Sequence, residues 1–385
     1  MSARYRLLLV VGARPNFMKI APIARQLERH TDIFEFTLIH TGQHYDAAMS
    51  EIFFGQLGIP RPDVDLEVGS DTHARQTAAI MAAFEPVVLD RRPDMVVVVG
   101  DVNSTIACAL VASKLGVRVA HVEAGLRSFD REMPEEINRL LTDQISDLLF
   151  VTEQSGVDNL LREGISADKI FLVGNVMIDT LLAHRSAAAS LDIAGRMGLE
   201  RHGYGLLTLH RPSNVDSPEA FEQLFAAIGE VARDIPIVFP VHPRTRRALA
   251  ESAVTRSLCD QARLRPLEPL GYLEFMSLMA DSAVVLTDSG GVQEETTVLG
   301  VPCLTLRTTT ERPATIAQGT NQLVGTQPER IIEGWQKVKA HRVATRVPPL
   351  WDGKAAERIV DVLRTVARRP AGAPPDGIPK AGALR

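Results

Sequence analysis

Short apolar runs rich in β-branched residues alternate with stretches of helical period along the first half of the chain. Met95-Val96-Val97-Val98-Val99 has no polar position, as is typical of a strand buried on both faces of a parallel sheet. The apolar runs predict strands at Leu7–Val11, Phe36–His40, Met95–Val99, Val117–Val122, Leu148–Thr152 and Ile170–Val173. The periodic stretches predict helices at Ile20–Arg29, Thr77–Asp90, Thr105–Leu115 and Glu135–Ile145.

The same alternation begins again in the second half. It predicts strands at Leu206–Leu209, Ile237–Val241, Ala283–Leu286 and Cys303–Leu306, with helices at Pro218–Arg233, Leu273–Ala280 and Gln293–Leu299. We therefore expect an α/β fold of two Rossmann-like, doubly wound domains. Two such halves place a ligand in a central cleft between the carboxyl ends of their strands.

The predicted domain boundaries follow from where the alternation stops and restarts. The first domain is expected over residues 1–174 and the second over residues 175–353, with no clear strand in the join at 177–205. A last helix is predicted over residues 354–368. Residues 369–385 are mostly proline, glycine and alanine, which predicts a mobile tail.

The composition and charge of the chain argue against several classes of protein. The 385 residues are 45% hydrophobic and 23% charged, with a formal net charge of −5, so there is no positive excess to coat a nucleic acid. The three cysteines lie far apart and form neither a disulfide framework nor a zinc motif. No apolar run reaches the roughly 20 residues of a membrane-spanning helix. We therefore expect a soluble, cytoplasmic protein without a metal site.

A glycine turn follows the first predicted strand, in Gly12-Ala13-Arg14-Pro15-Asn16-Phe17-Met18-Lys19. Free N–H groups where such a turn opens a helix can hold an anion. The turn is not GxGxxG, and no acid follows at the spacing of a dinucleotide site, so NAD is not expected. Arg14 and Lys19 are a candidate phosphate-binding pair, or two solvated charges.

Carboxylates recur at the ends of predicted strands and turns in the first half, namely Asp101, Glu123 and the pair Glu135-Glu136. A carboxylate at the carboxyl end of a parallel strand faces the ligand cleft rather than the sheet core. One alone is often a helix cap, and Asp101 could be one. Several in one half indicate acid–base chemistry, because crowded carboxylates repel one another unless a site uses them.

The second half carries its polar residues at equivalent positions. His210 ends one predicted strand and His242 the next. The strongest single motif is Asp288-Ser289-Gly290-Gly291-Val292-Gln293-Glu294-Glu295, in which the serine and glycines admit a phosphate to backbone N–H groups. Glu295 is placed to hold ribose hydroxyls. Arg312, in Thr310-Glu311-Arg312-Pro313, suits a diphosphate oxygen.

These motifs, taken in order, closely resemble a known family from Leu7 to about Arg368. The motifs are Gly12-Ala13-Arg14-Pro15, Gly100-Asp101, His121-Val122-Glu123-Ala124-Gly125-Leu126-Arg127, Pro134-Glu135-Glu136 with Asn138-Arg139, the Asp288–Glu295 segment and Thr310-Glu311-Arg312-Pro313. The set is similar to that of the non-hydrolysing UDP-N-acetylglucosamine 2-epimerases. That resemblance implies a GT-B fold in which the helix at 354–368 crosses back to the first domain. It also implies no cofactor, a UDP-sugar as substrate and a homodimer.

The resemblance also implies roles for individual residues. The family's catalytic groups match Asp101, Glu123, Glu135 and His210. Its nucleotide-sugar contacts match Arg14, Lys19, Ser289, Gly290, Gly291, Glu295 and Arg312, and its uracil pocket matches the segment with Leu273 and Phe275. The implied reaction interconverts UDP-GlcNAc and UDP-ManNAc by eliminating UDP across C1–C2 and re-adding it to 2-acetamidoglucal. It needs a base, an acid on the opposite face and cations at the departing diphosphate.

The chain departs from the regulated members of the family at one position. Gln43, His44, Arg75, Arg211 and His242 match the site for a second, allosteric UDP-GlcNAc. Asp46, however, stands where those members have glutamine. Three alternative activities stay open: the same chemistry on a diacetamido-uronic acid, a hydrolysing 2-epimerase that releases ManNAc, and a GT-B glycosyltransferase.

Overall fold

The computed structural model describes residues 4–42, 58, 60–340 and 346–368. The chain forms two compact units, Met1–Leu182 with Pro349–Arg385 and Ala183–Pro348. The division falls inside α7 (Val176–Ser190), a helix that the sequence pattern did not identify, and the chain re-enters the first unit at Pro349. The predicted tail at 369–385 lies outside the described residues.

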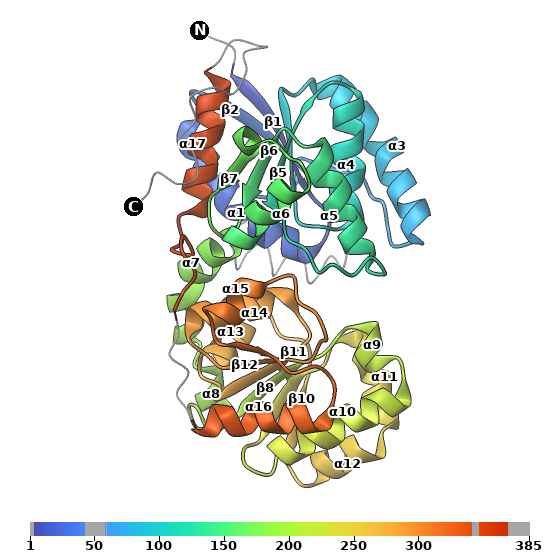
Figure 1. Cartoon of the computed structure of the whole chain (residues 1–385), viewed down its shortest axis with the longest axis vertical. Helices are drawn as coiled ribbons and strands as arrows, with labels where there is room; N and C mark the ends of the chain where they lie inside the picture. Colours follow the sequence, from blue (N-terminus) through green and yellow to red (C-terminus); the bar gives the residue numbers. More distant parts are fainter. Residues whose placement is uncertain (1–3, 43–57, 59, 341–345, 369–385) are drawn as a thin grey trace. The chain divides into compact units, whose positions relative to one another are not determined.

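The first unit is built on a sheet of seven described strands, all parallel, in the order β3-β2-β1-β4-β5-β6-β7 (Figure 1). Its strands are β1 (Tyr5–Val11), β2 (Phe34–His40), β3 (Val64–Asp65), β4 (Met95–Val99), β5 (Arg118–Ala124), β6 (Leu148–Val151) and β7 (Ile170–Leu172). All five residues of β4 are buried, so the valine run is a central strand covered on both faces, as predicted. Helices accompany the strands at α1 (Arg14–Leu27), α3 (His73–Arg91), α4 (Asn103–Lys114), α5 (Pro134–Ile145) and α6 (Gln154–Arg162).

The second unit repeats this plan with six described parallel strands in the order β10-β9-β8-β11-β12-β13. Its strands are β8 (Gly205–Thr208), β9 (Ile237–Pro240), β10 (Leu264–Leu267), β11 (Val284–Thr287), β12 (Cys303–Thr305) and β13 (Asn321–Leu323). Its helices are α8 (Ile193–Arg196), α9 (Pro212–Val215), α10 (Pro218–Val231), α11 (Pro243–Glu251), α12 (Ala253–Asp260), α13 (Tyr272–Ala280), α14 (Gly290–Leu299), α15 (Pro313–Ala317) and α16 (Pro328–Ala340). The predicted pair of Rossmann-like, doubly wound α/β units is confirmed.

Each sheet has one point where the strand order reverses. In the first unit the chain passes from β1 outward to β2 and later returns to add β4 on the other side of β1. In the second unit β8 and β11 are related in the same way. Loops that leave two neighbouring strands in opposite directions open a crevice at their carboxyl ends, which is the usual ligand site of such sheets.

The last described helix, α17 (Ala355–Ala367), packs against α1 in the first unit. Asp179 of α7 accepts hydrogen bonds from the backbone N–H groups of Ala355, at 3.1 Å, and Ala356, at 2.7 Å. These are the first N–H groups of α17, which have no partner within the helix. A side chain nearly two hundred positions earlier thus holds the start of the returning helix. No helix in the described part of the chain is long and apolar enough to cross a membrane.

Candidate active site

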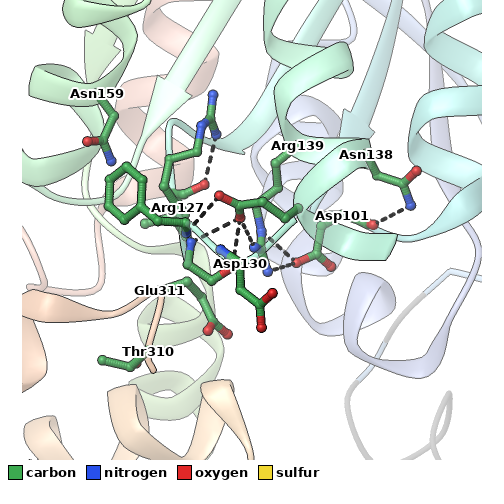
Figure 2. A network of polar contacts seen from close by, with 12 residues as sticks. Asp101, Arg127, Asp130, Asn138, Arg139, Asn159, Thr310 and Glu311 are labelled. Atoms are coloured by element: carbon green, nitrogen blue, oxygen red, sulfur yellow. Dashed lines mark hydrogen bonds and ion pairs between the residues drawn. The ribbon is translucent and has the colours of Figure 1, made fainter. Parts of the chain in front are cut away.

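Asp101 follows β4 at the switch point of the first sheet. Its carboxylate accepts two hydrogen bonds from Arg139 of α5, and its backbone carbonyl accepts one from Asn138 at 2.9 Å (Figure 2). The N-cap of α4 is Val102, and no side chain caps that end. Asp101 is therefore not the helix cap that its position also allowed. It is a partly exposed carboxylate, 28% accessible, held by a buried guanidinium.

Arg139 is itself held by a second carboxylate. Its Nη1 donates to Oε2 of Glu136 at 2.6 Å, and both side chains are buried. Glu136 also accepts hydrogen bonds from the backbone N–H groups of Ser128 and Phe129, each at 2.9 Å. Of the adjacent acids, Glu136 thus fixes the loop before α5 and orients Arg139. Glu135 lies in the first turn of α5 and is half-buried.

Glu123 ends β5 in an unusual backbone conformation. Its φ is +74°, and the pairing of β5 with β6 shifts register between Val122 and Ala124. A bulge of this kind re-aims the side chain that would otherwise follow the strand's alternation, at a backbone cost of about 1–3 kcal/mol for a non-glycine residue. The carboxylate of Glu123 forms a buried ion pair with the ammonium of Lys19 on α1.

The start of α1, which follows the glycine turn after β1, contacts the end of β4. Asn16 of α1 donates to the carbonyl of Val99, the last residue of β4, at 3.1 Å. A Cβ atom added to Gly100 would meet Lys19 Nζ at 3.1 Å and Asn16 Nδ2 at 3.2 Å. The structure therefore brings Lys19 and Glu123 together beside the peptide that precedes Asp101. Arg14 begins α1, and its side chain is not among those described.

His210 follows β8 at the switch point of the second sheet and pairs with Asp288, which follows β11. The ring Nδ1 lies 2.9 Å from Oδ1 of Asp288, and the His210 side chain is 40% exposed. Burial alone would raise the pKa of Asp288, but hydrogen bonds from His210 and from the backbone of Arg211 hold it below its usual value. The ionised carboxylate therefore favours the tautomer with a proton on Nδ1 and leaves Nε2 as the other reactive nitrogen.

The serine–glycine motif opens α14, with Ser289 as its N-cap. Ser289, Gly290 and Gly291 are all partly accessible. A Cβ atom on Gly290 would lie 2.6 Å from Oε1 of Glu311, so a larger residue at this position would displace the Glu311 carboxylate. Below the turn, Gln293 donates to the Ser289 carbonyl and accepts from Thr310 and Asn321, which ties the motif to the following loop.

Glu295 and Tyr272 form a buried pair within the second unit. The Tyr272 hydroxyl donates to Oε1 of Glu295 at 2.8 Å. Burial raises the pKa of Glu295 to about 7, against the lowering effect of the Tyr272 hydrogen bond. Leu273 and Phe275 follow Tyr272 on α13 and are both half-buried.

Arg312 is the N-cap residue of α15 and is only 5% exposed. Its Nε lies 2.6 Å from Oε1 of Glu294, which is fully buried. The neighbouring Glu311 pairs with Arg307 at 2.9 Å. The two arginines of this loop are thus anchored by acids of the same unit.

The residues predicted for a second, regulatory ligand are only partly described. Gln43 and His44 lie outside the described residues. Arg75 is exposed on α3 of the first unit. In the second unit, Arg211 donates to the carbonyl of Asp288 at 3.0 Å, and the rings of His242 and His210 have centroids 5.8 Å apart.

Sequence reasoning assigned no role to four residues that organise this site: Arg139, Asp143, Tyr272 and Asp288. One signal was available in the sequence. Glu135, Arg139 and Asp143 are spaced four apart, which places them on one face of α5. A polar stripe on a helix that follows a carboxylate-rich strand end could have indicated a supporting role. Tyr272 carries no comparable signal. Asp288 belongs to the Asp288–Glu295 motif, but its pairing with His210 joins positions that are far apart in the sequence.

Known proteins similar to this chain share this architecture. The family model described as UDP-N-acetylglucosamine 2-epimerase matches residues 25–364. The UDP-N-acetylglucosamine 2-epimerase of Methanocaldococcus jannaschii is 45% identical over 363 residues, which cover 93% of this chain and 98% of the relative. A crystal structure of the Methanocaldococcus jannaschii UDP-GlcNAc 2-epimerase in complex with UDP-GlcNAc and UDP matches with a TM-score of 0.86 and 44% identity, over 94% of this chain and 99% of that chain. The UDP-2,3-diacetamido-2,3-dideoxy-D-glucuronate 2-epimerase of Pseudomonas aeruginosa is 41% identical over 362 residues, covering 93% of this chain and 99% of the relative.

Proposed function

The chain belongs to the UDP-N-acetylglucosamine 2-epimerase family, and we propose that it interconverts UDP-GlcNAc and UDP-ManNAc without hydrolysing them. The observation that carries this proposal is the pair of carboxylates at the first switch point, Asp101 and Glu123, each held by a buried cation. Carboxylates oriented in this way beside a ligand crevice are suited to moving a proton on and off carbon.

The reaction must break a C–H bond that is not acidic. The carbon next to C2 of the sugar is an acetal, so no carbonyl stabilises a carbanion there. Loss of UDP across C1–C2 leaves 2-acetamidoglucal, and protonation of C2 on the opposite face with re-addition of UDP gives the epimer. Asp101, Glu123 and Glu135 are the candidates for the base and the acid.

The departing diphosphate needs positive charge and hydrogen-bond donors. We assign this task to Arg14, to the N–H groups at Ser289–Gly291 and to Nε2 of His210, whose Nδ1 is held by Asp288. Lys19 and Arg312 are assigned to the same anion, and each also pairs with a buried acid of its own unit. Glu295 is assigned to the ribose hydroxyls, and Leu273 with Phe275 to the uracil.

Incubation with UDP-GlcNAc in D₂O, followed by NMR, tests this function directly. We expect deuterium at C2 in both epimers, with UDP still attached to the sugar. Release of free ManNAc would instead identify a hydrolysing enzyme. No exchange in the absence of an acceptor would favour a glycosyltransferase.

A modified UDP-sugar is the second candidate substrate. It is favoured by the 41% identity to the Pseudomonas aeruginosa enzyme, whose name specifies a diacetamido-glucuronate. A carboxylate at C5 would need an additional cation in the sugar site. Competition between UDP-GlcNAc and the UDP-diacetamido-glucuronate in one reaction, read as the ratio of kcat/KM, separates the two substrates.

We further propose a cytoplasmic homodimer that supplies an activated sugar for surface polysaccharide. The resemblance to the family implies the dimer, and α5 supports it with two exposed apolar residues one turn apart, Ile137 and Leu141, which are 38% and 51% exposed. Light scattering coupled to gel filtration should give twice the mass of the chain. A Leu141→Glu variant that stays dimeric would show that this face of α5 is not the contact.

A further inference from the structure

His121 lies in the middle of β5, with none of its side chain exposed. Its two ring nitrogens each face an atom that accepts hydrogen bonds. Nδ1 is 2.7 Å from Oδ1 of Asp143 on α5, and Nε2 is 2.8 Å from the backbone carbonyl of Gly100. A neutral imidazole carries a proton on only one nitrogen, so it can satisfy only one of these two acceptors.

Asp143 is placed to remain ionised. Besides His121 it accepts a hydrogen bond from the N–H of Gly125 at 3.1 Å, and it pairs with Arg127 at 2.7 Å. Burial would raise the pKa of Asp143, but His121 and Arg127 together lower it. Arg127 also pairs with Glu163 at 2.6 Å, so charges of opposite sign alternate outward from His121. Only the imidazolium form, with a proton on each ring nitrogen, donates to an ionised Asp143 and to the carbonyl of Gly100 at the same time.

The carbonyl that His121 holds belongs to the peptide immediately before Asp101. Gly100 has a φ of +69°, and its own N–H donates to the carbonyl of Val122 at 3.0 Å. Both polar groups of Gly100 are therefore bound by β5, one through the backbone and one through the ring of His121. Without the second bond, the peptide between Gly100 and Asp101 is free to rotate, because glycine imposes little steric limit.

We propose that His121, held as an imidazolium by Asp143, is a positioning residue that fixes the Gly100–Asp101 peptide and thereby aims the carboxylate of Asp101. Arg139 and Asp143 lie four residues apart on α5, so the same helix holds Asp101 through its side chain and through the preceding peptide. This inference rests on the proposed function, in which Asp101 handles a proton of the sugar. A displacement of about 1 Å in such a group can lower the rate about 100-fold.

Two variants separate the geometry of His121 from its charge. His121→Phe removes the donor to Gly100, and we expect kcat to fall by about 100-fold, with KM and UDP affinity nearly unchanged. Asp143→Asn keeps the geometry with a neutral ring, because the introduced amide would donate to Nδ1 of His121 while Nε2–H still donates to Gly100. We therefore expect Asp143→Asn to keep most of the wild-type kcat. Glu163→Gln, which alters only the outer end of the charge chain, is the matched control and should be unchanged.

Nitrogen NMR of the histidine rings in the full-length protein tests the protonation state without using activity. We expect both nitrogens of His121 to carry protons in the wild type under the conditions of the activity assay, and only Nε2 to do so in Asp143→Asn. A wild-type ring with one bare nitrogen under these conditions would overturn the proposal. So would full activity of a folded His121→Phe, or a loss in Asp143→Asn as large as in His121→Phe. If His121→Phe fails to fold, the NMR and Asp143→Asn results still decide. A wild type that does not epimerise UDP-GlcNAc would refute the proposed function and leave the ring measurement standing.

Discussion

Arg139 donates to a single oxygen of Asp101 through two nitrogens, Nε at 3.0 Å and Nη2 at 2.6 Å. The third nitrogen of the same guanidinium, Nη1, donates to Oε2 of Glu136. This bond prevents the guanidinium from rotating away from Asp101. The planar, permanently charged fork of arginine makes such an arrangement rigid in a way that a lysine would not. The carboxylate of Asp101 is therefore directed before any substrate arrives.

Replacement of Asp101 by asparagine should lower kcat by at least about 100-fold, because a positioned acid or base contributes about 10²–10⁴-fold. The affinity for UDP should change little, since the residues assigned to UDP are mainly in the second unit. Steady-state kinetics and calorimetry on the same preparation measure both. Near wild-type turnover in the folded variant would remove Asp101 from the catalytic groups.

Glu123→Gln should also lower kcat by at least about 100-fold, for the same reason. It should in addition destabilise the first unit, because the ammonium of Lys19 would remain buried without a counter-charge. Loss of one partner of a buried pair costs about 3–5 kcal/mol. Urea denaturation measures the change in the free energy of unfolding. The double variant Lys19→Met with Glu123→Gln should recover stability but not turnover, whereas recovery of turnover would contradict a catalytic role for Glu123.

Glu295→Ala should act mainly on binding and weaken UDP affinity by about 1.5–3 kcal/mol, the value of hydrogen bonds to a charged group. Because the pKa of Glu295 is about 7, the affinity for UDP should also depend on pH. Below that pH the carboxyl is protonated and accepts fewer hydrogen bonds from the ribose, so UDP affinity should fall as pH decreases through 7 and stay level above it. Calorimetric titrations across this range measure the effect.

The variant Tyr272→Phe is a second test of the pH dependence of UDP binding. Its hydroxyl lowers the pKa of Glu295, so removal of the hydroxyl should move the midpoint of UDP binding to higher pH. A UDP affinity that equals the wild-type value in both variants would show that Glu295 serves only the pairing of α14 with α13 through Tyr272.

Asp179 should make the stability of the first unit depend on pH. Its pKa is raised by burial from 3.8 to about 6, partly offset by the hydrogen bonds from Ala356 and Ala355. The folded chain thus binds this proton more tightly than the unfolded chain. The contribution of Asp179 to the unfolding free energy should be highest below pH 3.8, fall by on the order of 3 kcal/mol as pH rises to about 6, and then level off.

Trp351 offers a local probe of this transition, because it is buried and donates to the carbonyl of Thr152 just before α17. In a Trp335→Phe background it is the one remaining tryptophan of the two in the chain. The contribution of Asp179 to the slope between pH 4 and 6 should be lost in Asp179→Asn, and it is measured as the difference between the two proteins. Equal slopes in the two proteins would assign the pH dependence to other groups.

Regulation by a second substrate molecule should be weak in this protein. The resemblance places an amide donor where this chain has Asp46, and a carboxylate there would repel the diphosphate of an allosteric ligand. We expect the reaction from UDP-ManNAc alone to proceed without added UDP-GlcNAc, and the forward kinetics to be close to hyperbolic. A reverse reaction that starts only after a trace of UDP-GlcNAc is added would contradict this.

The order of strands and helices could be predicted from the sequence where local pattern is strong. The valine run predicted β4 and the glycine turn after β1 predicted the start of a helix, because both features depend only on residues that are close in the sequence. Strands β10 and β13 were not predicted, since β10 contains an arginine and a proline and two of the three residues of β13 are polar, so neither forms an apolar run. The alanine-rich helix α7 was missed because its apolar residues surround the helix rather than forming a stripe.

For the site, the local pattern was enough to place the carboxylates, histidines and glycines at strand ends. The contacts of each side chain follow only from the folded arrangement of the elements. Asp101 meets Arg139 because α5 packs beside β5 and α4, and Asp179 reaches Ala355 because the chain returns to the first unit after completing the second. Such pairs join positions that are 38 and 176 residues apart. Periodicity assigns a residue to a face of its own element, but the partner on the next element depends on which strands become neighbours, and strand order is a property of the folded sheet.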